Sequence, residues 1–153
     1  MSYPLVMRGL AEEVQEYVAG NYFDAEGQPV YVFEGNAINF TLEDSANIQG
    51  LERLANSEVL VTLYDEGGTL LPSARRTAQE RSFRFAAKGA YAQEALDRAH
   101  DLLSWLWNRK AFTTAGFRVL VLRVPRLPQV VLRGASGSHV ADFVVTVQAY
   151  NNP

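Results

Sequence analysis

The sequence lacks cysteine altogether, and its 153 residues include only two histidines and two lysines. The absence of cysteine excludes disulfide bonds, thiolate catalysis and cysteine-ligated zinc. His100 and His139 have no second histidine at helical or hairpin spacing, so we do not expect either to bind a metal. We interpret His100 as a structural imidazole on a helix and His139 as a surface residue of a hairpin, and we predict no cofactor.

Long apolar runs are also absent. The longest stretch without Asp, Glu, Lys or Arg covers residues 143–153, which is eleven residues, whereas a membrane-spanning helix needs about 20. Near the start of the chain, a short apolar run precedes Arg8, which reverses the order of charge and apolar residues in a secretory signal. We therefore expect a soluble, intracellular protein that does not contact a membrane.

The motifs of common active sites are missing as well. The glycine-rich stretch 134–138 has no Gly-Lys-Ser/Thr ending and precedes a predicted strand, unlike a phosphate-binding loop. Ser136 does not stand in a Gly-x-Ser-x-Gly sequence. Asp65 and Glu66 follow an apolar run, but no histidine, lysine or second acidic cluster accompanies them, so we interpret them as turn residues rather than a catalytic base or cation site. We predict that the protein is not an enzyme.

The composition that is present is that of an ordinary globular protein. Hydrophobic residues make up 48% of the chain and charged residues 20%, which is far from the balance that keeps chains disordered. Domains commonly contain roughly 100–150 residues, so the length suits one domain with a substantial core. We predict a single domain over residues 1–153.

Apolar residues at helical spacing predict two helices, over residues 4–19 and 89–109. The apolar stripe of the second helix comprises Tyr91, Ala95, Ala99, Leu102, Leu103 and Leu106. Trp105 and Trp107 flank Leu106, which makes this helix too apolar for a surface helix with one buried face. Burial within the subunit is the simpler interpretation of the two tryptophans, and contact with another subunit is the alternative.

Runs of β-branched and aromatic residues predict strands over 30–34, 37–41, 59–64, 83–87, 117–124, 129–133 and 139–150. Residues 65–68 are expected to end one strand in a turn, and Pro125 is expected to end another. Residues 42–57 and 69–80 are predicted to be mostly loop. The element order predicts an α+β fold, in which an N-terminal helix and one long central helix pack on a mostly antiparallel sheet.

The formal charge of −3 conceals an uneven distribution along the chain. Residues 1–74 hold twelve acids and two basic groups, which gives −10, whereas residues 75–153 hold five acids and twelve basic groups, which gives +7. Complementary charge of this kind supplies orientation and selectivity in a protein contact. The two halves are expected to pair either between subunits or within one subunit.

Arginine is the most prominent feature of the second half. Twelve of the fourteen basic residues are arginines, the type that favours interfaces and bidentate pairing with carboxylates or phosphates. Those on predicted strands and their adjoining loops are Arg75, Arg76, Arg81, Arg84, Arg118, Arg123, Arg126 and Arg133. A solvated face, a protein interface and a nucleic-acid surface are the three interpretations, although net acidity and scarce lysine weigh against the third.

The chain resembles the tail terminator proteins of long-tailed bacteriophages, whose relatives include minor capsid and tail completion proteins. The resemblance rests on the strand Val59 to Tyr64 followed by Asp65-Glu66-Gly67-Gly68, then a loop and the strand Arg81 to Phe85. It continues with the long helix that opens at Tyr91, Ala95 and Ala99, and with a closing hairpin that ends in residues 143–150. The similarity covers nearly the whole chain in element order, apart from residues 35–57.

The resemblance implies a non-enzymatic virion protein at the junction of tail and head. Such a protein forms a hexameric ring, caps the finished tail tube and presents a surface to the head connector, so the implied partners are further copies of itself, the tail tube protein and the head-tail connector protein. We predict that subunit or partner contacts use Arg75, Arg76, Arg81, Arg84, Asp65, Glu66, Glu43 and Asp44. The alternative function is an α+β nucleic-acid-binding module that uses Arg81, Arg84, Arg118 and Arg123.

Overall fold

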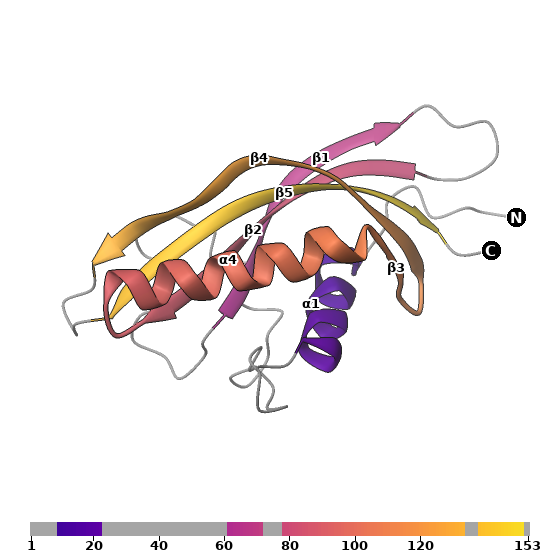
Figure 1. The fold of residues 1–153 in the computed structure, drawn as a ribbon. Helices are drawn as coiled ribbons and strands as arrows, with labels where there is room; N and C mark the ends of the chain where they lie inside the picture. The colour runs from indigo at the N-terminus through magenta and orange to yellow at the C-terminus, as the bar shows by residue number, and fades with distance from the viewer. Residues whose placement is uncertain (1–8, 23–60, 72–77, 134–137, 152–153) are drawn as a thin grey trace, which may run out of the picture.

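The computed structural model describes residues 9–22, 61–71, 78–133 and 138–151 (Figure 1). Two helices, α1 (Leu10–Asn21) and α4 (Ala92–Arg109), accompany a five-stranded sheet. The strands are β1 (Val61–Leu71), β2 (Ala78–Gly89), β3 (Ala111–Thr113), β4 (Phe117–Arg133) and β5 (His139–Asn151). All neighbouring strands are antiparallel, and their spatial order is β1-β2-β5-β4-β3. The predicted α+β fold with a mostly antiparallel sheet is confirmed.

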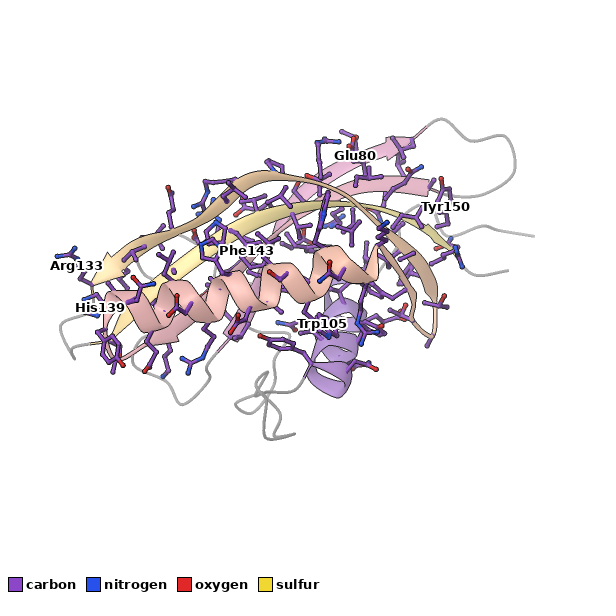
Figure 2. The ribbon with its side chains drawn as sticks, in the orientation of Figure 1. Glu80, Trp105, Arg133, His139, Phe143 and Tyr150 are labelled. Atoms are coloured by element: carbon purple, nitrogen blue, oxygen red, sulfur yellow. The ribbon has the colours of Figure 1, made fainter. Side chains whose placement is uncertain are left out.

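The hydrophobic core lies between the sheet and the two helices. Alternate residues of the central strand β5, such as Phe143 and Val145, are buried on the helix side together with Phe83 and Phe85 of β2. Figure 2 shows Phe143 between the sheet and α4. This period of two is the pattern that the sequence shows over 83–87, because successive side chains of a strand point to opposite faces. We call the face without the two helices the second face of the sheet.

Helix α4 follows the predicted stripe, with Ala95, Ala99, Leu102 and Leu106 buried. Tyr91 does not belong to this stripe as predicted: it is extended at the N-cap and 60% exposed. Helix α1 begins after Gly9, whose φ of 77° is left-handed and is therefore incompatible with a helix that continues through this residue from position 4. Residues 4–8 lie outside the described part of the chain, and α1 extends beyond residue 19 to Asn21.

The predicted turn at residues 65–68 is wrong, because β1 continues through it. Asp65 is opposite Phe83 and Gly67 is opposite Ser82, so Glu66 is one extra residue on β1, which defines a β-bulge. Gly67 has a φ of 88°, and its N–H donates to the Asp65 side chain at 2.8 Å. The strands β1 and β2 thus cover parts of the predicted loop 69–80, and only residues 72–77 of it lie outside the described ranges.

The predicted break at Pro125 is also wrong, since β4 is one strand of 17 residues that includes both the 117–124 and 129–133 runs. Its pairing with β5 is interrupted four times between Val121 and Leu132, and Pro125 and Pro128 stand in these irregular intervals. Proline lacks an N–H donor and is tolerated at bulges and on edge strands. The sequence analysis missed the short strand β3. Among the described residues, β3 pairs with residues 118–120 of β4.

The predicted hairpin over 30–41 and the predicted loop over 42–57 lie outside the described part of the chain. The terminal hairpin is confirmed: the last residue of β4, Arg133, is paired with the first residue of β5, His139, at one end of the sheet (Figure 2). Among the described helices, none has the length and apolar content that crossing a bilayer requires.

Candidate interaction surfaces

Four of the eight predicted contact residues are described, and the structure brings these four together. Asp65 and Glu66 lie on β1, beside Arg81 and Arg84 on β2. Arg75, Arg76, Glu43 and Asp44 lie outside the described residues. Asp65 is opposite Phe83 just before the bulge, and Glu66 is the extra residue of the bulge, so both acids lie beside β2.

Asp65 and Arg81 form a close ion pair. The Arg81 Nε donates to both carboxylate oxygens of Asp65 at 2.9 Å, and its Nη2 lies 2.5 Å from Oδ2. The remaining Nη1 donates to the Gln79 side chain at 3.0 Å. Three of the donors of Arg81 are therefore engaged inside the subunit, as expected for a guanidinium that orients a carboxylate.

A longer charge network crosses four strands on the second face of the sheet. The Nε of Arg84 lies 2.7 Å from the Glu66 carboxylate, and its Nη1 lies 3.5 Å from the Oδ2 of Asp142 on β5. Arg126 of β4 donates to the other oxygen of Asp142. The network thus alternates acid and base across β1, β2, β5 and β4, with two charges of each sign.

Asp142 is the residue of this network that the sequence analysis missed. It is fully buried, yet it is the one acidic residue in the otherwise apolar and polar run of β5. A buried carboxylate in a strand needs a charged or hydrogen-bonding partner. A lone acid at an alternating position of an apolar strand was therefore the available signal, but the sequence does not tell which arginines face it.

A further ion pair joins β2 and β4. The Nη1 of Arg123 lies 2.5 Å from the Glu80 carboxylate, although the Arg123 side chain remains 59% exposed. Glu80 lies toward the end of the sheet that also carries Tyr150 (Figure 2). Of the four arginines assigned to the nucleic-acid alternative, Arg81, Arg84 and Arg123 are therefore ion-paired, and only Arg118 has no ion pair within the described ranges.

An aromatic cluster joins α1 to α4 and β3. Trp105 contacts the rings of Tyr17 and Tyr22, with centroids 6.1 and 5.2 Å away, and Tyr17 stacks on Phe112. Figure 2 shows Trp105 between α4 and α1. The predicted burial is correct for Trp105, which is partly buried against the core, and wrong for Trp107, which is 47% exposed because it is on the outer side of α4.

Charged side chains lie beside the rings of this aromatic cluster. The guanidinium of Arg109 lies 4.3 Å from the ring centroid of Trp105 and donates to the Tyr17 hydroxyl at 2.8 Å. Burial, assisted by the nearby Asp101 carboxylate and opposed by Arg98, raises the pKa of Tyr22 to about 12. Tyr22 consequently remains neutral at any physiological pH, and the cluster is a structural contact that fixes α1 against α4.

The described helices carry a net negative charge and the described strands carry a net positive charge. The two helices hold six acids and two basic residues, whereas the five strands hold four acids and seven basic residues. The helices therefore carry a net −4 and the strands a net +3. The uneven charge along the sequence becomes, within the described residues, an acidic helix layer on one side of a basic sheet.

The two histidines are apart. His100 is exposed on α4, and His139 is half-buried at the start of β5. Within residues 9–22, 61–71, 78–133 and 138–151, no group of three or more His, Asp and Glu side chains is arranged to hold a metal ion. The charged side chains of the described strands form ion pairs with one another across the sheet.

No protein-family model matches the sequence, and no curated protein matches it at a significant level.

Proposed function

We propose that this protein is a structural subunit of a phage tail, of the tail terminator type, which forms a ring that caps the tail tube and joins it to the head connector. The order of the described elements supports this proposal. Helix α1, the β1–β2 hairpin, the long helix α4 and the terminal β4–β5 hairpin follow one another as in the family that the sequence resembles. The paired acids of that resemblance, Asp65 and Glu66, lie within β1 rather than after it.

The observation that carries the proposal is the separation of charge between two sides of the subunit. A ring of identical subunits is held by heterologous contacts, in which one surface meets a different surface of the next copy. An acidic helix layer and a basic sheet provide two different and complementary surfaces on the same chain. Electrostatic complementarity of this kind fixes the orientation of neighbours and discourages wrong pairings.

The four described contact residues pair with one another inside the subunit rather than being left free for a neighbour. Asp65 pairs with Arg81 and Glu66 pairs with Arg84 inside one subunit, so these four charges neutralise one another there. Their role in subunit contacts remains a prediction. Within the described ranges, the surplus charges of the sheet lie elsewhere, at residues such as Arg118 and Arg133.

The nucleic-acid alternative has less support. Phosphate binding depends on cations that are free to replace counterions. Arg81, Arg84 and Arg123 are already paired with carboxylates of the same chain. A strand of nucleic acid would therefore have to break these pairs or bind beside them.

Native mass spectrometry and light scattering test the proposed function, with the purified protein alone and mixed with tail tubes. A closed oligomer, or attachment of the protein to one end of the tubes, is the expected result. The proposal would be abandoned if only monomers were found in both conditions. Binding to oligonucleotides that falls with salt and with Arg118→Glu would favour the alternative function instead.

A further inference from the structure

Helix α1 presents only acidic charge to its surroundings. Glu12, Glu13 and Glu16 are its charged residues, and it contains no basic residue. Glu16 is exposed and Glu12 is half-buried, and neither has an ion pair among the described residues. The Oε1 of Glu13 accepts a hydrogen bond from the N–H of Gly116 at 2.7 Å, which holds α1 beside the turn between β3 and β4.

The second face of the sheet carries cations at this same end. Arg118 is opposite Tyr150, and Arg123 is opposite Thr146 of β5. Directly opposed residues share a face, and Tyr150 and Thr146 alternate with the core residues Ala149, Val147 and Val145, so both arginines lie on the second face. Both side chains are exposed, although Arg123 is ion-paired with Glu80, so Arg118 is the cation of this pair without an ion pair among the described residues. Leu122 between them is 38% exposed. We call Arg118, Leu122 and Arg123 the basic end of β4.

One end of the subunit therefore has acids on its helix side and cations on its opposite side. Gly116, whose N–H binds Glu13 of α1, is only two residues before Arg118 of β4. The acidic side of α1 and the basic end of β4 therefore lie back to back across the sheet. An acidic helix cannot reach the second face of its own sheet through the intervening strands. Within one copy the two surfaces stay separate, while two copies placed one behind the other bring them together.

We propose that the acidic side of α1 in one copy docks on the basic end of β4 in a second copy of this chain. This inference rests on the proposed ring and names the surfaces that meet in it. The occupant is argued from charge complementarity: the matching acidic and basic surfaces belong to the same chain, and they lie on opposite sides of it. Such a contact is heterologous, so each copy uses α1 toward one neighbour and β4 toward the other.

The test is charge reversal on each surface and on both together. In Glu16→Lys and in Arg118→Glu, like charges meet in every contact, and the dissociation constant of the oligomer is expected to rise about tenfold or more. In the double variant both surfaces are reversed, so opposite charges meet again and association returns toward that of the wild type. Sedimentation velocity and light scattering over a concentration series measure these constants.

Arg133→Glu is the matched control, because it makes the same change in net charge on an exposed residue of β4 at the opposite end of the sheet. It is expected to leave association unchanged. Exposed substitutions usually change stability little, and circular dichroism checks that each variant keeps its fold. Glu16→Gln and Arg118→Gln, which remove charge without reversing it, serve if a reversed variant does not fold, and each is expected to weaken association by a smaller factor.

The outcomes separate this inference from the proposed function. Weakening by both single reversals with recovery in the double variant supports the docking of α1 on β4. If rings form and their stability responds to Glu16→Lys and Arg118→Glu no more than to Arg133→Glu, the docking is overturned while the ring proposal stands. Wild-type protein that stays monomeric even with tail tubes overturns both. Binding of a DNA or RNA oligonucleotide that is lost in Arg118→Glu would assign the basic end of β4 to nucleic acid and would also overturn the docking.

Discussion

At the scale of single residues, Asp142 shows how the sheet uses charge. Its carboxylate is fully buried on the central strand and accepts from Arg126 on one side, with Arg84 3.5 Å away on the other. A buried ion pair contributes little net stability over an apolar pair, but removing one partner leaves the other charges uncompensated. We infer that the network helps to hold β2, β5 and β4 in one register and that losing its central carboxylate destabilises the fold.

We predict that Asp142→Asn lowers the free energy of unfolding by about 2 kcal/mol, because it leaves two guanidinium groups beside each other without the charge between them. The value is below that of a fully buried pair, since the Arg84 and Arg126 side chains remain 26% and 27% exposed. Urea denaturation followed by circular dichroism measures the change. Arg118→Gln, at a position on the same face that has no ion pair among the described residues, should differ from the wild type by less than about 0.5 kcal/mol. An equally small effect of Asp142→Asn would contradict the proposed role of the network.

Gln15 is an unusual residue for the inner side of α1. Its side chain is 1% exposed, and neither Nε2 nor Oε1 has a hydrogen-bond partner among the described residues. Buried polar groups without partners cost about 1–3 kcal/mol. We predict that Gln15→Leu raises the free energy of unfolding by about 1 kcal/mol, as measured by urea denaturation. Gln15→Ala should lower it, because the smaller residue leaves a cavity; destabilisation by Gln15→Leu would show that the amide makes a bond.

Tyr22 gives the protein a predictable response to alkaline pH. Because the folded state raises the pKa of Tyr22 from 10.0 to about 12, the folded state holds the phenolic proton more tightly than the unfolded chain does. This contribution to stability is complete below pH 10.0 and is lost as the pH rises toward about 12. We predict a fall in the free energy of unfolding on the order of 2 kcal/mol over this range. Tyr22→Phe should remove that part of the fall, and an unchanged pH profile in Tyr22→Phe would assign the effect to other groups.

At the scale of elements, the bulge in β1 depends on two adjacent glycines for different reasons. Gly67 has a φ of 88°, although a Cβ there would meet nothing. Gly68 has no positive φ, but a Cβ there would overlap the carbonyl oxygen of Glu80 on β2. Positive φ costs an L-residue roughly 1–2 kcal/mol, whereas an overlap with backbone forces strands apart.

We therefore predict that Gly67→Ala lowers the free energy of unfolding by about 1 kcal/mol and that Gly68→Ala lowers it by more, about 2 kcal/mol or above. Thermal unfolding by calorimetry compares the two variants. Gly67→Asn is the matched control, because asparagine tolerates the left-handed conformation better than alanine, and it should be milder than Gly67→Ala. The opposite ranking of Gly67→Ala and Gly68→Ala would show that the strands do not approach as closely as described.

The errors of sequence interpretation at this scale have one physical cause. Gly67, Gly68 and Pro125 are residues that commonly end strands, and the sequence analysis ended one strand at residues 65–68 and another at Pro125. In the fold, β1 and β4 continue because a neighbouring strand supplies pairing on both sides of each irregularity. The local sequence indicates where a strand is irregular, but it does not indicate the long-range hydrogen bonds that keep the strand continuous.

At the scale of the whole molecule, the acidic helices and the basic strands would make the proposed self-association sensitive to salt. Screening shortens the range of charge interactions from about 10 Å at 0.1 M salt to about 3 Å at 1 M. We predict that the proposed oligomer dissociates at least about tenfold more readily over this range, as measured by sedimentation equilibrium. Stronger association at high salt would indicate a contact dominated by apolar residues such as Leu127 and Trp107, which are 66% and 47% exposed.

The sequence by itself determined the features that depend on local periodicity and composition. The helical spacing of Ala95, Ala99, Leu102 and Leu106 and the alternation around Phe83 and Phe85 were sufficient for the α+β class and for part of the core. These patterns are readable because burial of an element's apolar side depends on its own repeat, whichever element covers it.

Only the tertiary structure decided which charges meet. The sequence shows an acidic first half and a basic second half, but it does not show which groups pair. Asp65 pairs with Arg81 and Asp142 pairs with Arg126, in each case 16 residues apart in the sequence. Strand pairing, which no local pattern reveals, brings these groups together. The same folding places the acids of α1 and Arg118 of β4 on opposite sides of one sheet. Ion pairs form between groups that the register brings within a few ångströms, and register is a property of the assembled sheet rather than of any one segment.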